Sequence, residues 1–146
     1  MNMQCGEKPI SVLIQTYDTA FQNAAGGVQN RIVRTVSALR MNGCNVEFFD
    51  KFHSVVDQYD ILHAFMLEVG NLGLMQYAKS HGKKVILSAI VGLEKGSIID
   101  AYWKMRKIPV MTTYKRLFQM CDLADAIITE TQKEADFIAK HYHVPE

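Results

Sequence analysis

Residues 26–43 read Gly-Gly-Val-Gln-Asn-Arg-Ile-Val-Arg-Thr-Val-Ser-Ala-Leu-Arg-Met-Asn-Gly, and this stretch predicts the first helix of the chain. Its apolar side chains recur every three or four residues, which places them on one face of a helix. Gly43 is suited to end that helix in a left-handed conformation. Apolar runs at residues 10–15 and 45–49 flank the stretch and predict strands. The region therefore predicts a strand–helix–strand unit.

The same alternation continues along the sequence. Further strands are predicted at residues 60–66, 84–91 and 126–129. Helices are predicted at residues 70–81, 98–107, 112–124 and 131–142, the last opened by a Thr131/Glu134 capping box. Strands that alternate with helices predict an α/β fold with a doubly wound parallel sheet. Ligands bind such sheets beyond the carboxyl ends of the strands, so we expect a site in the loops at residues 16–27, 51–54, 66–70 and 91–97.

Composition limits the possible functions. The 146 residues fit one domain, and 49% of them are hydrophobic, enough for a sizeable core. The 16 basic and 15 acidic residues give a net charge of +1, which argues against nucleic acid as a partner. The odd number of cysteines without C-x-x-C spacing predicts reduced thiols in a cytosolic protein; they are Cys5, Cys44 and Cys121. The sequence predicts neither a metal ion nor a cofactor.

Gly26 and Gly27 are the first candidate site residues. A glycine pair at a helix N-terminus lets an anion such as diphosphate approach free backbone N–H groups. The alternative interpretation is a tight turn with no ligand. The pair does not form the G-x-G-x-x-G pattern of dinucleotide-binding domains, although Asp50, at the end of the second strand, could serve a ribose.

Five short motifs occur in order along the chain, at residues 26–29, 38–46, 60–64, 124–128 and 142–145. They are similar, respectively, to the Gly-Gly-Ala-Glu, Leu-Ala-x-x-Gly-His-Glu-Val, Asp-x-x-His-x-His, Ala-Asp-x-x-Ile and Tyr-Gly-Val-Pro motifs of family 4 glycosyltransferases. The resemblance implies the GT-B architecture, in which two Rossmann-like domains face each other. Residues 1–146 then correspond to the N-terminal, acceptor-side domain, without the C-terminal domain that binds the donor.

The resemblance also implies roles for individual residues. Gly26 and Gly27 would face the donor diphosphate, and His63 would lie on the acceptor side of the cleft. The alternative interpretation of His63 is a core histidine whose ring nitrogen meets a backbone group. Ile90 occupies the position of a histidine that lies near the transferred sugar in many members. Because Ile90 cannot form a hydrogen bond, no catalytic residue is assigned.

The function implied by the resemblance is retaining hexosyl transfer from a nucleotide sugar to a glycan or lipid-linked acceptor, in polysaccharide or cell-envelope biosynthesis. The donor would bind only with a C-terminal domain, so we expect this chain to be inactive alone. We expect a cytoplasmic protein, peripheral to the inner face of the membrane, and a homodimer formed through the exposed interdomain face.

Residues 98–107 offer a membrane contact, because two aromatic residues stand beside three basic ones there. The alternative is an ordinary amphipathic helix with Ile98, Tyr102 and Met105 packed inward. For the whole chain, two other functions remain open. One is a non-catalytic flavodoxin-like or receiver-like module that binds a partner, and the other is a nucleotide-binding Rossmann domain.

Overall fold

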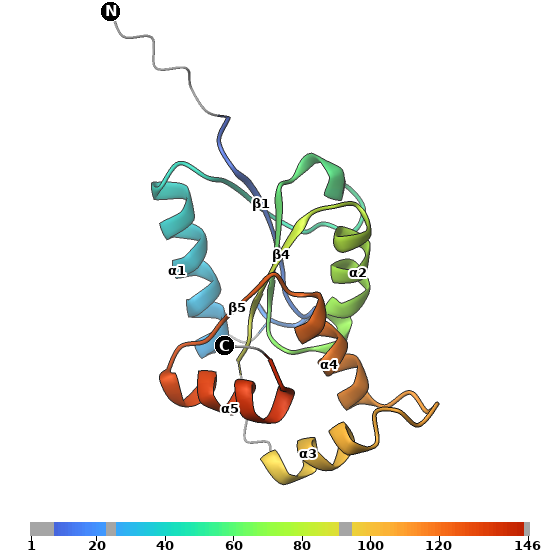
Figure 1. The fold of residues 1–146 in the computed structure, drawn as a ribbon. Coiled ribbons are helices and arrows are strands. Elements are labelled where there is room, and N and C mark those ends of the chain that lie inside the picture. The colour runs from blue at the N-terminus through green and yellow to red at the C-terminus, as the bar shows by residue number, and fades with distance from the viewer. Residues whose placement is uncertain (1–7, 23–25, 91–94, 145–146) are drawn as a thin grey trace, which may run out of the picture.

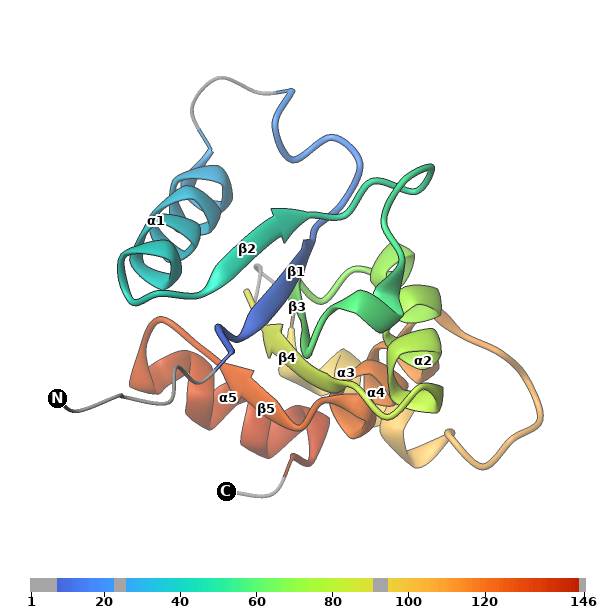
Figure 2. The same cartoon turned by 90° about the horizontal axis from the view of Figure 1, so that it is seen from above.

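The computed structural model describes residues 8–22, 26–90 and 95–144. Its centre is a sheet of five parallel strands in the order β2-β1-β3-β4-β5 (Figures 1 and 2). The strands are β1 (Ser11–Gln15), β2 (Asn45–Phe48), β3 (Ile61–Phe65), β4 (Lys84–Ser88) and β5 (Ala126–Ile128). The predicted doubly wound parallel sheet is therefore confirmed, and the fold is Rossmann-like α/β.

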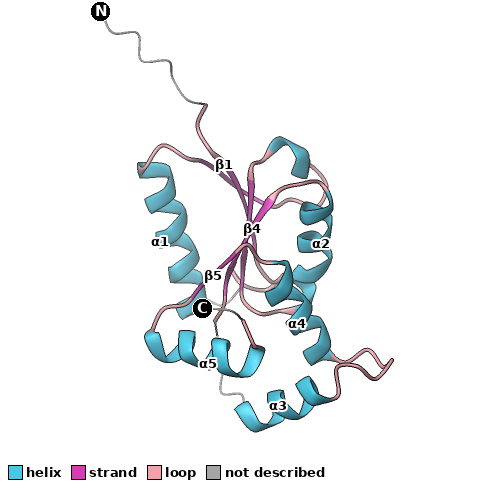
Figure 3. Ribbon diagram, in the orientation of Figure 1, coloured by secondary structure: helices cyan, strands magenta, loops and turns pink. Residues whose placement is uncertain are grey.

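Helices cover both faces of the sheet (Figure 3). They are α1 (Gly27–Met41), α2 (Leu72–Ser80), α3 (Gly96–Lys104), α4 (Thr113–Leu123) and α5 (Gln132–Tyr142). Helix α1 lies on one side, and α2 and α4 lie on the other (Figure 1). Helix α3 packs against α4 and α5. Two 3₁₀ turns, η1 (Val56–Gln58) and η2 (Val69–Asn71), precede β3 and α2.

The core has two parts because the central strands are buried on both faces, as their continuous apolar sequences predict. In β1, Val12 and Ile14 pack toward α1, where they meet Ile32 and Val36 of that helix. Leu13 points the opposite way, into a larger cluster that includes residues of α2, α3, α4 and α5. The apolar face predicted for residues 26–43 is thus the face that α1 buries.

Helix ends follow the sequence signals closely. Gly43 and Gly82 adopt φ angles of +83° and +71°, which terminate α1 and α2. The Thr131/Glu134 capping box is present at the start of α5. The helix predicted at residues 98–107 is displaced, however, and spans Gly96–Lys104.

This displacement corrects the inward face predicted for that helix. Ile99 is fully buried, whereas Ile98 is 44% exposed and Met105 is 53% exposed. Tyr102 is half-buried and stacks on Tyr114 of α4, with 4.6 Å between ring centroids. The reason is that α3 ends at Lys104, so Met105 leaves the helix face that Ile99 and Tyr102 share.

Two aspartates fasten the amino edge of the sheet, opposite the expected site. Asp60, just before β3, accepts hydrogen bonds from the Ser11 N–H (2.8 Å) and hydroxyl (2.7 Å). Asp125, just before β5, accepts from the Val85 N–H at 2.8 Å and from Lys79 at 2.9 Å. These bonds lower the pKa of both carboxyl groups. Each aspartate therefore joins its own strand to a neighbouring one.

Within the described residues, none of the helices combines the length and the apolar character needed to span a bilayer.

Candidate functional site

A groove of about 690 Å³ opens at the carboxyl ends of β1 and β2. Its walls come from the residues that follow β1 and from those that end β2, which are neighbours because the two strands pair in parallel. Ligand sites commonly occupy this edge of a doubly wound sheet and have volumes of ~300–1,000 Å³. The groove therefore lies where the strand pattern predicts a site, within the 16–27 and 51–54 loop regions and the end of β2.

Aromatic rings form much of the groove wall. Phe21 and Phe48 meet edge to face, with 5.6 Å between ring centroids and an interplanar angle of 87°. They are 41% and 42% exposed, so a ligand could cover much of their surface. Asp18 and Lys51 also line the groove and supply one charge of each sign. The groove thus combines apolar ring surfaces with polar groups suited to hydroxyl-bearing ligands.

The loop that begins in this groove leads to α1, and Gly26 and Gly27 lie at the start of that helix. Gly26 is the N-cap in an extended conformation, and no side chain caps the helix there. Gly27 is exposed. A Cβ added at either position would meet no heavy atom within 4 Å, and neither residue has a left-handed backbone. Among the described residues, no neighbouring atom requires glycine at these two positions.

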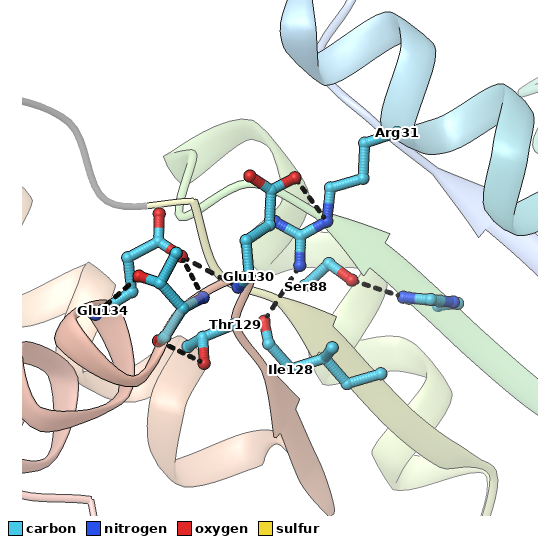
Figure 4. A network of polar contacts seen from close by, with 8 residues as sticks. Arg31, Ser88, Ile128, Thr129, Glu130 and Glu134 are labelled. Atoms are coloured by element: carbon cyan, nitrogen blue, oxygen red, sulfur yellow. Dashed lines mark hydrogen bonds and ion pairs between the residues drawn. The ribbon is translucent and has the colours of Figure 1, made fainter.

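Arg31 lies one turn beyond Gly27 on the same side of α1. Its guanidinium bridges α1 to the carboxyl end of β5: Nε lies 3.4 Å from a Glu130 carboxylate oxygen, and Nη2 donates to the Ile128 carbonyl at 3.5 Å (Figure 4). Nη1 is buried and has no hydrogen-bond partner among the described residues. The Glu134 carboxylate accepts a hydrogen bond from the Glu130 N–H at 2.8 Å. The α5 cap therefore positions the carboxylate that pairs with Arg31.

His63 lies beneath this region, within β3. It is only 4% exposed, its Nε2 lies 2.8 Å from the Ser88 hydroxyl, and its ring stacks on Phe65. Burial, helped by the positive charge of Arg31, lowers the pKa of His63 to about 4. The imidazole is therefore neutral near pH 7. The burial agrees with the core interpretation, but the hydrogen-bond partner of the ring is the Ser88 side chain rather than a backbone group.

The turn after β3 is held in an unusual conformation. Met66 has a φ of 77°, which is rare for a residue with a side chain. Asn71 is fully buried, and its amide group donates to the carbonyls of Phe65 (2.9 Å) and Met66 (3.1 Å). Strained residues of this kind cluster at functional sites. Asn71 therefore fixes the shape of the third loop at the carboxyl edge.

Two other predicted residues, Ile90 and Asp50, are not among those that line the groove. Ile90 follows β4 and is half-buried. Asp50, considered for a ribose, accepts hydrogen bonds within its own loop, from the Phe52 N–H at 2.9 Å and from His53 at 2.7 Å. Cys44 and Cys121 are free thiols, and Cys5 lies outside the described residues. Residues 91–94 of the fourth predicted loop also lie outside them.

Sequence reasoning missed Arg31, Ser88 and Glu130, because they come together only through the sheet. Arg31 lies beside the apolar face of its helix, and its partner is 99 residues away in sequence. Phe21 and Phe48 could have been found, since each lies at or beyond the end of a predicted strand. Among the described residues, no group of three or more His, Cys, Asp or Glu side chains could hold a metal ion.

Comparisons of the chain with protein-family models, with curated proteins and with solved structures give no match.

Proposed function

We propose that this chain forms the acceptor-side domain of a retaining glycosyltransferase with two facing Rossmann-like domains. Its groove would bind a glycan or the sugar of a lipid-linked acceptor, and the start of α1 would face the diphosphate of a nucleotide-sugar donor. The observation that carries the proposal is that an aromatic groove lies at the carboxyl ends of β1 and β2, and that the segment leaving β1 leads from it to the start of α1, where no described neighbour requires glycine.

The groove supports the acceptor half of the proposal. A pyranose ring has an apolar face of C–H groups and a rim of hydroxyls. The ring surfaces of Phe21 and Phe48 suit the apolar face, and Asp18 can accept hydrogen bonds from hydroxyls at the rim. A volume of about 690 Å³ leaves space for more than one sugar residue.

The start of α1 supports the donor half. The first N–H groups of a helix and its dipole favour an anion, and glycine lets a phosphate come close to the backbone. Arg31, one turn along, adds a guanidinium that is paired with Glu130 and whose buried Nη1 has no hydrogen-bond partner among the described residues. Catalysis would then depend on orienting donor and acceptor and on stabilising the departing diphosphate.

Sugar titrations followed by nuclear magnetic resonance test the acceptor half. We expect mono- and disaccharides to shift signals of residues 15–21 and 48–51. Phe21→Ala and Phe48→Ala should each weaken the affinity about 5- to 30-fold, the loss expected for one buried aromatic contact of ~1–2 kcal/mol. Phe52→Ala is the matched control, because Phe52 is 79% exposed and does not line the groove. Equal losses in all three variants would contradict the proposal.

The flavodoxin-like partner-binding module remains the second candidate, and the strand order favours it. The order β2-β1-β3-β4-β5 is also that of flavodoxin-like sheets. Such a module would bind no sugar, so saccharides would leave the signals of the groove residues unshifted. The same titration therefore separates the two functions.

A further inference from the structure

The connection between α3 and α4, residues 105–112, projects from the body of the molecule (Figures 1 and 3). The view from above shows the same projection, so it is not an effect of one orientation (Figure 2). We call this segment the α3–α4 loop. It lies outside the groove and outside the Arg31 region, by which we mean Arg31 with its partners Glu130 and Ile128. The proposed transfer reaction gives the loop no role.

The α3–α4 loop exposes several apolar side chains, and four of them are consecutive at residues 108–111. Met105, Ile108, Val110 and Met111 are 46–59% exposed, and Pro109 between them is exposed as well. Apolar residues exposed singly are normal on protein surfaces, but a contiguous group at the tip of a projecting loop marks an interaction site.

Basic residues surround this apolar tip. From residue 101 to residue 121 the sequence contains no Asp or Glu, although the chain as a whole is almost balanced in charge. The basic side chains of this segment are Lys104, Arg106, Lys107, Lys115 and Arg116. Lys104, Lys107 and Arg116 are exposed. The surface that the loop presents is therefore apolar at its tip and positive at its base.

The other two basic residues hold the loop in shape. Arg106 donates to the Trp103 carbonyl at 2.8 Å and lies over the Trp103 ring, 4.0 Å from its centroid. Lys115 donates to the Ile108 carbonyl at 3.2 Å. Backbone bonds within the loop, from Ile108 to Met105 and from Val110 to Ile108, add to this. The tip is therefore presented in a fixed form.

We propose that the α3–α4 loop docks the protein on an anionic lipid bilayer. Met105, Ile108, Val110 and Met111 would enter the headgroup region, and Lys104, Lys107 and Arg116 would meet lipid phosphates. An apolar tip with a basic base fits an anionic membrane surface, where apolar burial and charge attraction act together. Nucleic acid fits less well, because phosphate recognition gives no reason for four exposed apolar side chains.

Vesicle sedimentation with the full chain tests this. We expect binding to vesicles of equal parts phosphatidylcholine and phosphatidylglycerol, reduced by high salt, and little binding to phosphatidylcholine alone. Lys104→Gln with Lys107→Gln should weaken the partition coefficient about 30-fold, since each basic residue near an anionic surface contributes about 1 kcal/mol. Val110→Ser with Met111→Ser should weaken it about tenfold or more, through lost apolar burial.

Matched controls lie elsewhere on the surface. Lys133→Gln with Lys140→Gln removes two exposed lysines of α5, and Met41→Ser with Phe52→Ser removes two apolar side chains that are each 79% exposed. Both controls should bind vesicles as the wild type does, and all variants should keep the wild-type circular dichroism spectrum. Equal effects in loop and control variants overturn the proposal. Self-association through the tip also overturns it. In that case sedimentation velocity would show a dimer for the wild type and a monomer for the Val110→Ser, Met111→Ser variant, and neither protein would bind vesicles.

Discussion

At the scale of single residues, the environment of His63 decides what the histidine can do. Its ring is enclosed between Phe65 and Ser88 and faces the charge of Arg31. Protonation would place a second positive charge in a buried site, so the pKa of His63 falls to about 4. An unfolded chain pays no such cost and binds the proton near its ordinary pKa of about 6.5.

This difference predicts the pH dependence of stability. Between about pH 6.5 and pH 4 the unfolded state binds the proton and the folded state does not, so stability falls as the pH falls, by about 3 kcal/mol in total for a shift of this size. His63→Gln, which keeps a hydrogen-bonding side chain next to Ser88, should flatten the dependence in this window. Urea unfolding across the range measures it. His81→Gln, at an exposed position, should leave the slope as it is, and an unchanged slope in His63→Gln would contradict the burial argument.

The cysteines give a second prediction at this scale. Burial, together with the nearby Asp122, raises the pKa of Cys121 to about 12, whereas Cys44 is half-buried. In a Cys5→Ser variant, a thiol reagent at pH 8 should therefore modify Cys44 in the native state and Cys121 only on unfolding. Mass spectrometry of the labelled peptides gives the order. Native labelling of Cys121 at the rate of Cys44 would show that α4 opens readily.

At the scale of elements, the contact between α3 and α5 restricts which residue can occupy position 96. A Cβ at Gly96, the first residue of α3, would overlap the ring of His141 on α5. That ring is held by a 2.8 Å hydrogen bond to Asp100 and cannot move away freely. Gly96→Ala should lower the free energy of unfolding by about 1–3 kcal/mol, the usual cost of overpacking.

A double-mutant cycle isolates this contact. In a His141→Ala background the space opens, so Gly96→Ala should cost nothing or stabilise slightly through the helix propensity of alanine. Chemical unfolding of the four proteins gives the coupling energy. Equal costs of Gly96→Ala in both backgrounds would show that the α3–α5 contact does not restrict this glycine.

Asp125 supports a prediction about the sheet. Its carboxylate, 27% exposed, accepts from the Val85 N–H and pairs with Lys79. Asp125→Ala should lower the free energy of unfolding by about 1–3 kcal/mol, because it leaves the Val85 N–H without its acceptor.

Since these bonds lower the pKa of Asp125, the contribution of the ionised carboxylate to stability is complete above about pH 4. It is lost as the pH falls through the lower pKa of the folded state. Thermal unfolding should show a larger difference between variant and wild type at pH 7 than at pH 2.5. Asp122→Ala, three residues earlier and exposed, is the control.

The elements also show what the sequence could predict. Strand and helix positions followed from periodicity, because β1 and α1 bury the residues that the pattern selects. The cap glycines and the α5 capping box followed from local chemistry. The end of α3 did not, since no glycine or proline marks Lys104. Contacts such as Arg31–Glu130 could not be predicted either, because they depend on which strands become neighbours.

At the scale of the whole molecule, parallel strands bring distant loops to one edge, and this makes a site from residues that are unremarkable separately. The groove needs β1 beside β2, and the Arg31 region needs α1 beside the end of β5. At the amino edge, Asp60 and Asp125 instead hold neighbouring strands together through hydrogen bonds. One edge of the sheet is therefore fastened by side chains, and the other carries the groove.

Gly27 allows a test of that division. Because a Cβ at this position meets no heavy atom within 4 Å, Gly27→Ala should fold normally and gain up to about 1 kcal/mol of stability. The exposed α1 start should bind nucleotide diphosphate sugars weakly, with Kd of order millimolar, about 4 kcal/mol. Titration with UDP-, GDP- and ADP-sugars, followed by the amide signals of residues 26–30, should show this, and Gly27→Ala should weaken it by obstructing the approach to the backbone. Val33→Ala, on the exposed part of the same helix, should not. A Gly27→Ala variant that is more stable yet binds the donor less well would mean that the glycine is needed for the ligand. Unchanged binding would mean that the diphosphate does not contact the start of α1 at Gly27. Micromolar donor binding or sugar transfer by this chain alone would contradict the proposal that the donor site belongs to a second domain.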